Sequence, residues 1–159
     1  MVNPTVIEAD LSDAMHAVAI VDLLNEYAQE PMIDAKPLDD AVRATLIDRL
    51  REHPTTHVFL AKEDDQFIGL AICFRGFSTF RARPLINVHD IAVRKAWRGK
   101  GVGRLLLTAV EAFAVRNECC SITLEVKDYN EPARRAYLAV GFEEGTPGKD
   151  ATRFMTKRL

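Results

Sequence analysis

The chain lacks any segment that would place it in a membrane or export it. No apolar run within its 159 residues comes near the ~20 residues that a membrane-spanning helix needs. The opening residues, Met1-Val-Asn-Pro-Thr-Val-Ile-Glu-Ala-Asp10, do not show the basic and then apolar pattern of a signal peptide. We therefore expect a cytoplasmic protein with no membrane partner.

Cysteine is scarce as well. The chain has three cysteines, an odd number, and Cys119 stands next to Cys120; adjacent cysteines rarely bridge each other, so a disulfide framework is not expected. His16, His53 and His57 are not spaced as metal ligands, either from one another or from the cysteines. We expect reduced thiols and no metal.

Net charge is also small. The 21 basic and 23 acidic side chains leave a net charge of −2, which argues against a nucleic-acid-binding protein. Five basic residues nevertheless lie within one short window: Arg94, Lys95, Arg98, Lys100 and Arg104. A local basic excess in a nearly neutral chain predicts a compact polyanionic ligand such as coenzyme A.

The same window has the pattern of a strand, a glycine loop and a helix. Val88, Ile91 and Val93 favour a strand, and Arg98-Gly-Lys-Gly-Val-Gly-Arg104 follows as a loop. Apolar residues then recur at helical spacing: Val102, Leu105, Leu106, Ala109, Val110 and Phe113. The first helical turn has unpartnered N–H groups and a positive dipole, and glycine lets a phosphate approach closely. The pattern predicts a phosphate site.

Two common phosphate loops fit this pattern poorly. A Walker loop needs Ser or Thr after Gly-Lys, whereas Gly101 follows Gly99-Lys100. A Rossmann turn needs a third glycine where Leu106 stands, and the strand ends too early for it. Glu125, at the end of the next expected strand, could serve as a ribose-binding acid. An NAD-type nucleotide enzyme therefore stays an alternative.

The motif Arg98-Gly-Lys-Gly-Val-Gly103 resembles the pyrophosphate loop of the GNAT superfamily of N-acetyltransferases. The strand-like stretch Ser121-Ile-Thr-Leu-Glu-Val126 and the segment Asn130-Glu-Pro-Ala-Arg-Arg-Ala-Tyr137, which leads to Gly141-Phe142, follow at the spacing of that family. The resemblance covers about residues 56–145. It implies an α/β (α+β) GNAT acyl-CoA N-acyltransferase fold in one domain, residues 1–159. That fold has a mixed central sheet of about six to seven strands, flanked by about four helices, with splayed parallel strands at the cofactor site.

The pattern of apolar residues gives the expected elements. Strands are expected at 5–9, 56–61, 67–74, 88–93, 119–126 and 151–157, and helices at 12–29, 38–52, 102–117 and 132–141. The second helix should bury Val42, Leu46, Ile47 and Leu50. The strand at 119–126 is continuously apolar and should be buried on both faces, as a parallel strand is. Residues 76–84 should form a longer connection.

The resemblance implies acetyl-CoA as cosubstrate and assigns residues to it. Backbone groups of Ile91, Ala92 and Val93 would bond the pantetheine arm, and the Val93 N–H would polarise the thioester carbonyl. The pyrophosphate site would comprise Arg98, Gly99, Lys100, Gly101, Val102, Gly103 and Arg104. Asn130 would bond the arm, and Tyr137, two helical turns later, would protonate the departing thiolate.

The acceptor amine must lose a proton before it attacks. For a lysine-like amine of pKa about 10.4, deprotonation at neutral pH costs roughly 4–5 kcal/mol. His89 and Asp90, on the strand beside the expected thioester, are the best candidates for the base, and Glu125 is a weaker one. Neighbouring strand residues point to opposite faces unless a bulge intervenes, so the sequence does not decide between His89 and Asp90.

The acceptor itself is less well defined. Phe77–Pro84, His89-Asp90 and Tyr129–Pro132 resemble the spermidine/spermine acetyltransferase branch, which usually carries an acidic pair where His89-Asp90 stand. We expect a primary amine of a small molecule, either a polyamine or an amino acid, bordered by the loop 32–37. A protein lysine or N-terminal acceptor and a non-catalytic acyl-CoA-binding module are the alternatives. Many relatives dimerise, so a homodimer is expected.

Direct attack in a ternary complex is expected rather than an acyl-cysteine intermediate. Cys119 and Cys120 lie next to each other on a strand expected to be buried, and no histidine is near them in sequence. Such cysteines are typical of a protein core.

Overall fold

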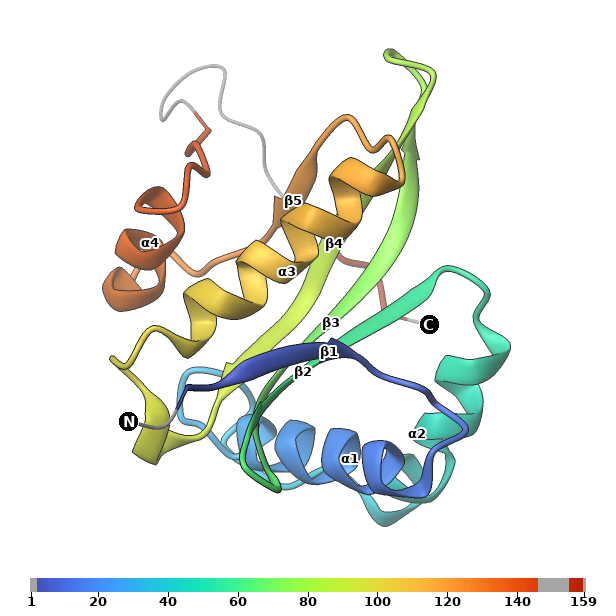
Figure 1. Cartoon of the computed structure of the whole chain (residues 1–159), viewed down its shortest axis with the longest axis vertical. Helices are drawn as coiled ribbons and strands as arrows, with labels where there is room; N and C mark the ends of the chain where they lie inside the picture. Colours follow the sequence, from blue (N-terminus) through green and yellow to red (C-terminus); the bar gives the residue numbers. More distant parts are fainter. Residues whose placement is uncertain (1–2, 146–154, 159) are drawn as a thin grey trace.

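The protein is built around one five-stranded mixed sheet (Figure 1). The structure, a computed structural model, describes residues 3–145 and 155–158. The elements are β1 (Thr5–Glu8), α1 (Ala14–Ala28), α2 (Asp40–Glu52), β2 (Thr56–Glu63), β3 (Gln66–Ser78), β4 (Arg83–Val93), the short 3-10 helix η1 (Lys95–Trp97), α3 (Val102–Arg116), β5 (Ile122–Leu124) and α4 (Glu131–Leu138). The strand order is β1-β2-β3-β4-β5, and only the pair β4–β5 is parallel. No helix among the described residues is long and apolar enough to cross a membrane.

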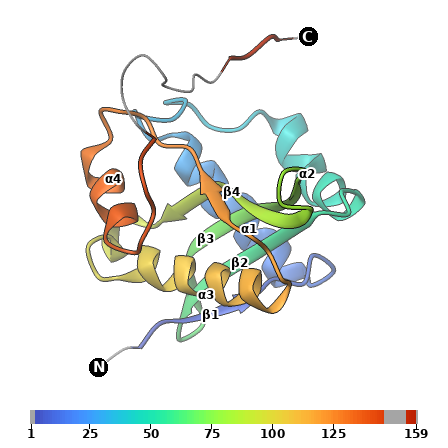
Figure 2. The same ribbon diagram turned by 90° about the horizontal axis from the view of Figure 1, so that it is seen from above.

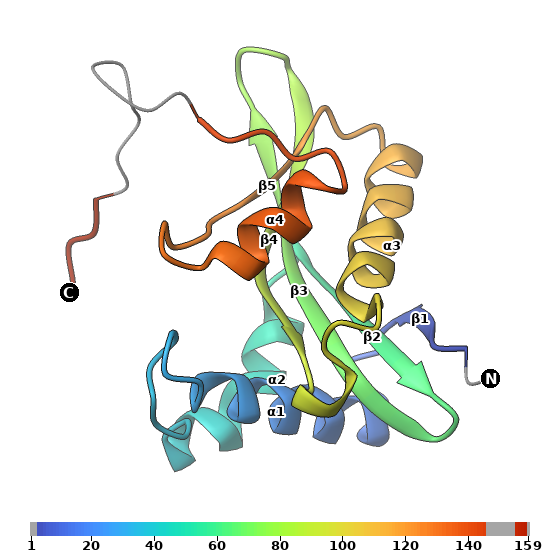
Figure 3. The same cartoon turned by 90° about the vertical axis from the view of Figure 1, so that its left-hand side faces the viewer.

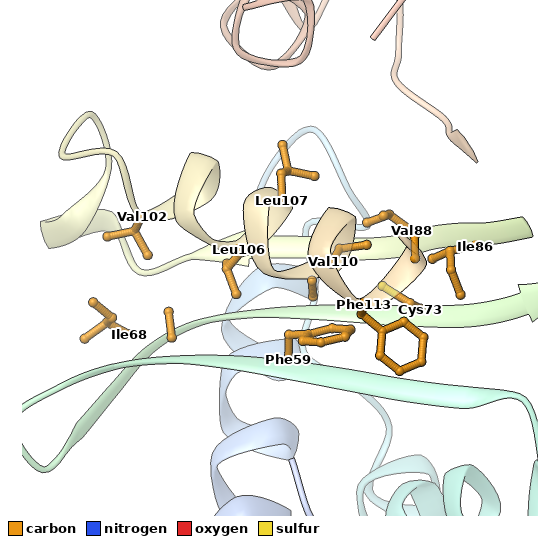
Figure 4. Packing of buried hydrophobic residues seen from close by; sticks show 13 residues of the cluster. Phe59, Ile68, Cys73, Ile86, Val88, Val102, Leu106, Leu107, Val110 and Phe113 are labelled. Carbon is orange, nitrogen blue, oxygen red and sulfur yellow. The ribbon is translucent and has the colours of Figure 1, made fainter. Parts of the chain in front are cut away.

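Two hydrophobic clusters hold helices to the two faces of the sheet. Between the sheet and α3 lie buried side chains that include Phe59, Ile68, Val88, Leu106, Val110 and Phe113 (Figure 4). The cluster on the other face joins Ile20 and Leu23 of α1 and Leu50 of α2 to Leu60 and Leu70 of the sheet. Figure 2 shows α3 and α2 on opposite sides of the strands. The expected α/β architecture, a mixed central sheet with helices on both faces, is confirmed.

The described residues supply five of the expected six to seven strands, and most of the strand expected at 151–157 lies outside the described residues. One expected detail of the second helix is wrong. Val42 is 42% exposed, because only the C-terminal half of α2, with Leu46, Ile47 and Leu50, packs on the α1 cluster.

The expected strand at 119–126 is only three residues long and is not buried on both faces. Thr123 is exposed, and Cys119 and Cys120 precede the strand as half-buried free thiols. Cys119 packs at the edge of the hydrophobic cluster under α3, and Cys120 is not part of that cluster, so neither is the fully buried core residue expected from the sequence. The strand is short because β4 and β5 share only three residue pairs.

The β3–β4 hairpin is longer than expected. The two strands pair as far as Ser78 and Arg83, so most of the connection expected at 76–84 is strand instead. Figure 1 shows this hairpin projecting beyond the rest of the sheet.

A β-bulge at His89 changes which side chains of β4 face which layer. Cys73 pairs with Val88 and Ile72 pairs with Asp90, so His89 is an extra residue without a partner in β3. Val88 packs toward α3, and after the bulge Ile91 does so too. Asp90, paired with a residue of the α1 cluster, therefore faces α1, and the His89 ring lies 5.4 Å from the Phe74 ring on that same side. Both candidate bases share one face of the sheet.

Beyond the bulge, β4 and β5 separate. Their parallel pairing runs from Ile86 with Ile122 to Val88 with Leu124, and β5 ends there. β4 continues to Val93, pairing on its other edge with β3. The splayed parallel strands expected from the sequence are present.

Candidate active site

A cleft of about 660 Å³ opens where the strands separate. Figure 3 faces the side of the molecule on which α4, the start of α3 and the end of α1 come together. Among the residues expected at the cofactor, those lining the cleft are Ile91, Ala92, Val93, Arg98, Gly99, Gly101, Val102, Gly103, Arg104, Asn130 and Tyr137. The volume is that of a small-molecule site. Residues from the ranges 91–104 and 130–137, which are distant in sequence, thus line the same cleft.

The glycine loop directs unpartnered N–H groups at this cleft. Gly99 and Gly101 have φ of +74° and +84°, a conformation that other residues adopt only with strain. Gly101 is the N-cap of α3, and the Leu105 N–H makes the first helical bond to its carbonyl, at 3.0 Å. The preceding N–H groups of the first turn receive no side-chain cap in the described part of the chain. They are suited to an anion.

The free edge of β4 presents backbone groups to the cleft. The Arg94 N–H donates to the Ile68 carbonyl of β3 at 2.9 Å. Because backbone groups of successive strand residues point to opposite edges, Val93 and Ile91 direct theirs away from β3. The Ala92 carbonyl points toward β3, since it lies 2.9 Å from where a Cβ on Gly69 would be. Of the three residues expected to bond the pantetheine arm through their backbone, two present it to the cleft.

The basic side chains of the loop have different surroundings. Arg98 donates through Nε to the Val93 carbonyl at 2.9 Å and through Nη2 to the Glu30 carboxylate at 2.7 Å. Lys100 lies outside the cleft lining, with its Nζ 5.9 Å from the centre of the Trp97 ring. Arg104 stands in the first turn of α3 and lines the cleft.

Asn130 and Tyr137 belong to α4. The Asn130 side chain caps this helix by accepting the Ala133 N–H at 3.4 Å. Tyr137 lies two turns later on the cleft wall, with its ring 5.9 Å from that of Phe142. Burial raises the pKa of the Tyr137 phenol. The hydroxyl therefore keeps its proton at neutral pH, as a proton donor must.

His89 and Asp90 lie outside the cleft lining, on the α1 face of β4. Burial raises the pKa of the Asp90 carboxyl, and the nearby His89 opposes that shift. His89 is exposed, and so is Glu125, which also lies outside the lining. A buried carboxyl with a raised pKa is a better proton acceptor than an exposed one, so Asp90 is the stronger candidate base.

Sequence reasoning placed the loop 32–37 beside the acceptor but missed the contribution of α1, of Glu30 and of Trp97. Tyr27, Glu30, Met32 and Ile33 line the cleft, as does Trp97. Burial, followed by the Asp90 charge, raises the pKa of Tyr27 to about 12. In the sequence, Tyr27 is one residue of an apolar helix face, and nothing there signals that it reaches the site.

The loop after α1 is fixed at two points. The Lys127 ammonium donates to the Met32 carbonyl, and the Leu38 N–H donates to the Asn25 side chain at 2.9 Å. Met32 and Ile33, in the loop that the sequence predicted to border the acceptor, add apolar side chains to the cleft wall. Among the residues described, no group of three or more His, Cys, Asp and Glu side chains could hold a metal ion.

Comparison with known proteins gives consistent matches. The family model described as "Acetyltransferase (GNAT) family" matches residues 18–142. The chain is 33% identical over 139 residues to an uncharacterized N-acetyltransferase of Bacillus subtilis, covering 87% of this chain and 89% of that one. It is 28% identical over 148 residues to the thialysine N-epsilon-acetyltransferase of Bos taurus, covering 87% and 84%.

A solved structure shows the same fold. An aminoglycoside acetyltransferase from an uncultured soil metagenomic sample superposes with a TM-score of 0.74 at 16% identity, covering 95% of this chain and 97% of that one.

Proposed function

The chain belongs to the acetyltransferase (GNAT) family, an acetyl-CoA-dependent group of N-acetyltransferases, and on this premise we propose that it acetylates a primary amine of a small molecule. The amine attacks acetyl-CoA directly within a ternary complex, in a single transferase domain. The observation that carries the proposal is the cleft between the separated strands β4 and β5, with unpartnered helical N–H groups at one end.

The residues of the cleft fit acetyl-CoA. The N–H groups at the start of α3 would hold the diphosphate, with Arg104 beside them. The backbone groups of Ile91 and Val93 would bond the pantetheine arm as a neighbouring strand does, and the Val93 N–H would face the thioester oxygen. Acetyl-CoA supplies the activated acetyl group, and the chain supplies its alignment.

Two residues would carry the proton transfers: Asp90, on the α1 face of β4 outside the cleft lining, and Tyr137, on the cleft wall. Asp90, directly or through water, takes a proton from the amine as its nitrogen forms the new bond to the acetyl carbon. The carbon–sulfur bond breaks, and Tyr137 gives its proton to the departing thiolate. The raised pKa values of both groups support these roles.

The half-buried cysteines support direct transfer. Cys119 and Cys120 line a neighbouring hollow beside α3 and β5 and are not in the lining of the cleft that holds Tyr137. Burial raises the pKa of the Cys119 thiol, which keeps it protonated and a poor nucleophile. We therefore propose no acyl-cysteine intermediate.

A small amine is supported by the proposed acceptor side of the cleft. Tyr27, Met32 and Ile33 form a mainly apolar wall there with the Glu30 carboxylate among them, and Asp90 is close enough to Tyr27 to raise its pKa. The Bos taurus relative is named for acetylation of the ε-amine of thialysine, an amino acid. We propose an amino-acid-like or polyamine acceptor rather than a protein.

Thiol release from acetyl-CoA, screened over polyamines, amino acids and lysine peptides, tests the proposal. Turnover with a small amine is expected. Turnover with peptides alone would contradict the acceptor class, and cofactor binding without turnover on any amine would contradict catalysis.

We further propose that the protein acts as a homodimer in the cytoplasm. Its three cysteines are all free, which suits a reducing compartment. Light scattering coupled to size-exclusion chromatography tests the assembly, and a monomer at micromolar concentration would contradict it.

A further inference from the structure

One ion pair connects the cofactor side of the cleft to the acceptor side. Arg98 donates through Nη2 to Glu30 Oε1 at 2.7 Å and through Nη1 to Oε2 at 3.4 Å. Its Nε donates to the Val93 carbonyl at 2.9 Å. All three nitrogens of the guanidinium are therefore engaged within the protein. A planar group with donors on two edges can hold two acceptors at a fixed separation.

The three connected parts have different tasks. Arg98 opens the glycine loop, and Val93 presents its backbone at the end of β4. Glu30 lies just after α1, two residues before Met32 in the acceptor-side wall. Arg98 and Glu30 both line the cleft themselves. A movement of the loop after α1 would therefore be transmitted through Glu30 and Arg98 and would displace Val93 and the phosphate loop.

We propose, on the basis of the proposed function, that Glu30 is a positioning residue that acts through Arg98. Glu30 holds the guanidinium on the Val93 carbonyl. It thereby fixes Val93, whose N–H faces the thioester in the proposed function, and the phosphate loop relative to the acceptor wall. Arg98 then serves alignment rather than charge neutralisation of the diphosphate. This differs from the diphosphate contact that the sequence resemblance implied for Arg98.

The chain contains a natural comparison for this pair. Glu26, one turn earlier on α1, pairs with Arg94 at 3.1 Å. Arg94 precedes the glycine loop and lies outside the cleft lining, and its backbone N–H bonds β3. The two ion pairs therefore share a helix and a chemistry but differ in what they connect.

Replacing Glu30 by Gln should separate catalysis from cofactor affinity. The released guanidinium can turn toward the diphosphate, and one negative charge near it is lost, so the Kd for coenzyme A should stay equal or fall. The acetyl group is then less well aligned, and kcat should fall about tenfold, as small misplacements at reacting centres do. A role in folding alone would instead lower the melting temperature and leave both constants of the folded fraction unchanged.

Three further variants sharpen the test. Glu26→Gln is the matched control and should leave kcat within about twofold of the wild type, because neither Glu26 nor Arg94 lines the cleft. Glu30→Asp keeps the charge and should recover part of the lost kcat. Arg98→Lys cannot hold both acceptors, because its ammonium is a single point of contact. In the Arg98→Lys background, Glu30→Gln should therefore have almost no additional effect on kcat.

The experiment measures kcat with the best amine of the screen, Kd for coenzyme A by calorimetry, and thermal melting of each variant. A lower kcat without weaker coenzyme A binding, together with non-additivity in the double variant, supports the inference. An unchanged kcat, weaker coenzyme A binding or full additivity overturns it. A wild-type protein without turnover on any amine would remove the proposed function and this inference together, whereas an active wild type with an equally active Glu30→Gln removes this inference alone.

Discussion

The side chains with the greatest chemical consequence lie half-buried rather than in the core. Tyr137 and Asp90 each have their pKa raised by burial, which favours the neutral form of both. For the phenol this preserves a proton to donate, and for the carboxyl it raises the affinity for a proton taken from the amine. Burial thus adjusts both groups toward their proposed tasks.

Tyr137→Phe removes the proposed proton donor and keeps the ring. We expect kcat to fall about 100-fold, a typical contribution of general acid catalysis, with little change in coenzyme A affinity. Single-turnover kinetics, which report the chemical step, provide the measurement. An unchanged chemical rate in the folded variant would show that Tyr137 is not the acid.

Asp90→Asn should have opposite effects on activity and stability. A folded-state pKa raised above the ordinary 3.8 means that the ionised carboxyl destabilises the fold, and that this penalty appears as pH rises through the folded pKa. The amide removes it, so the variant should melt higher near neutral pH. The difference should vanish as pH falls below 3.8.

Activity of the same variant tests the base. If Asp90 accepts the proton of the amine, kcat of Asp90→Asn should fall about 100-fold or more. His89→Gln is the comparison, because His89 shares the same face of β4 but is exposed. A larger loss in His89→Gln than in Asp90→Asn would reverse the assignment.

Among the elements, the start of α3 depends most on backbone conformation. Gly101 has φ of +84°, and a Cβ there would meet no atom within 4 Å, so a substitution acts through strain rather than collision. Gly101→Ala should introduce about 1–2 kcal/mol of strain, which the loop can relieve only by turning its N–H groups. We expect acetyl-CoA affinity to fall about tenfold, because 1.4 kcal/mol corresponds to a factor of ten.

Gly145→Ala provides the control for that prediction. A Cβ on Gly145 would also meet no atom within 4 Å, but the φ of this residue is not in the left-handed region and it lies outside the cleft lining. The affinity of this variant for acetyl-CoA should match that of the wild type. Equal affinities in the two variants would dissociate the loop conformation from cofactor binding.

The elements also show what the sequence could and could not predict. The helix over 102–117 and its glycine N-terminus followed from local rules, namely apolar spacing and the need for positive φ. The bulge at His89 did not, because it depends on how β3 pairs with β4 and leaves no composition signal. Likewise, the sequence does not show that Tyr27 and Glu30 line the cleft, because this depends on how α1 packs beside β4.

At the scale of the whole molecule, the cleft divides the sheet into a continuous antiparallel part and a short parallel strand. β5 holds to β4 by three residue pairs, reinforced by the Asn87 side chain, which donates to the Thr123 hydroxyl at 3.1 Å. A ligand that bonds both walls of the cleft would therefore link β4 to the β5 side of the sheet, where few residue pairs connect them. We expect such a ligand to raise the free energy of unfolding.

Coenzyme A at a concentration 100 times its Kd should raise the free energy of unfolding by about 2.7 kcal/mol. For a domain of this size that corresponds to a rise in melting temperature of about 5–10 °C. Differential scanning fluorimetry over a coenzyme A series measures it, with adenosine as the control ligand that lacks the diphosphate. A shift with adenosine equal to that with coenzyme A would contradict binding through the start of α3.

The bare edge of β4 between Asp90 and Val93 has one more consequence. An unpaired strand is a template onto which a foreign strand can add, and such edges promote aggregation. With acetyl-CoA bound as proposed, the cosubstrate would cover that edge during the catalytic cycle, and the ligand would then also protect the protein against misassembly. Preparations depleted of coenzyme A should lose protein to precipitation sooner than preparations that retain it.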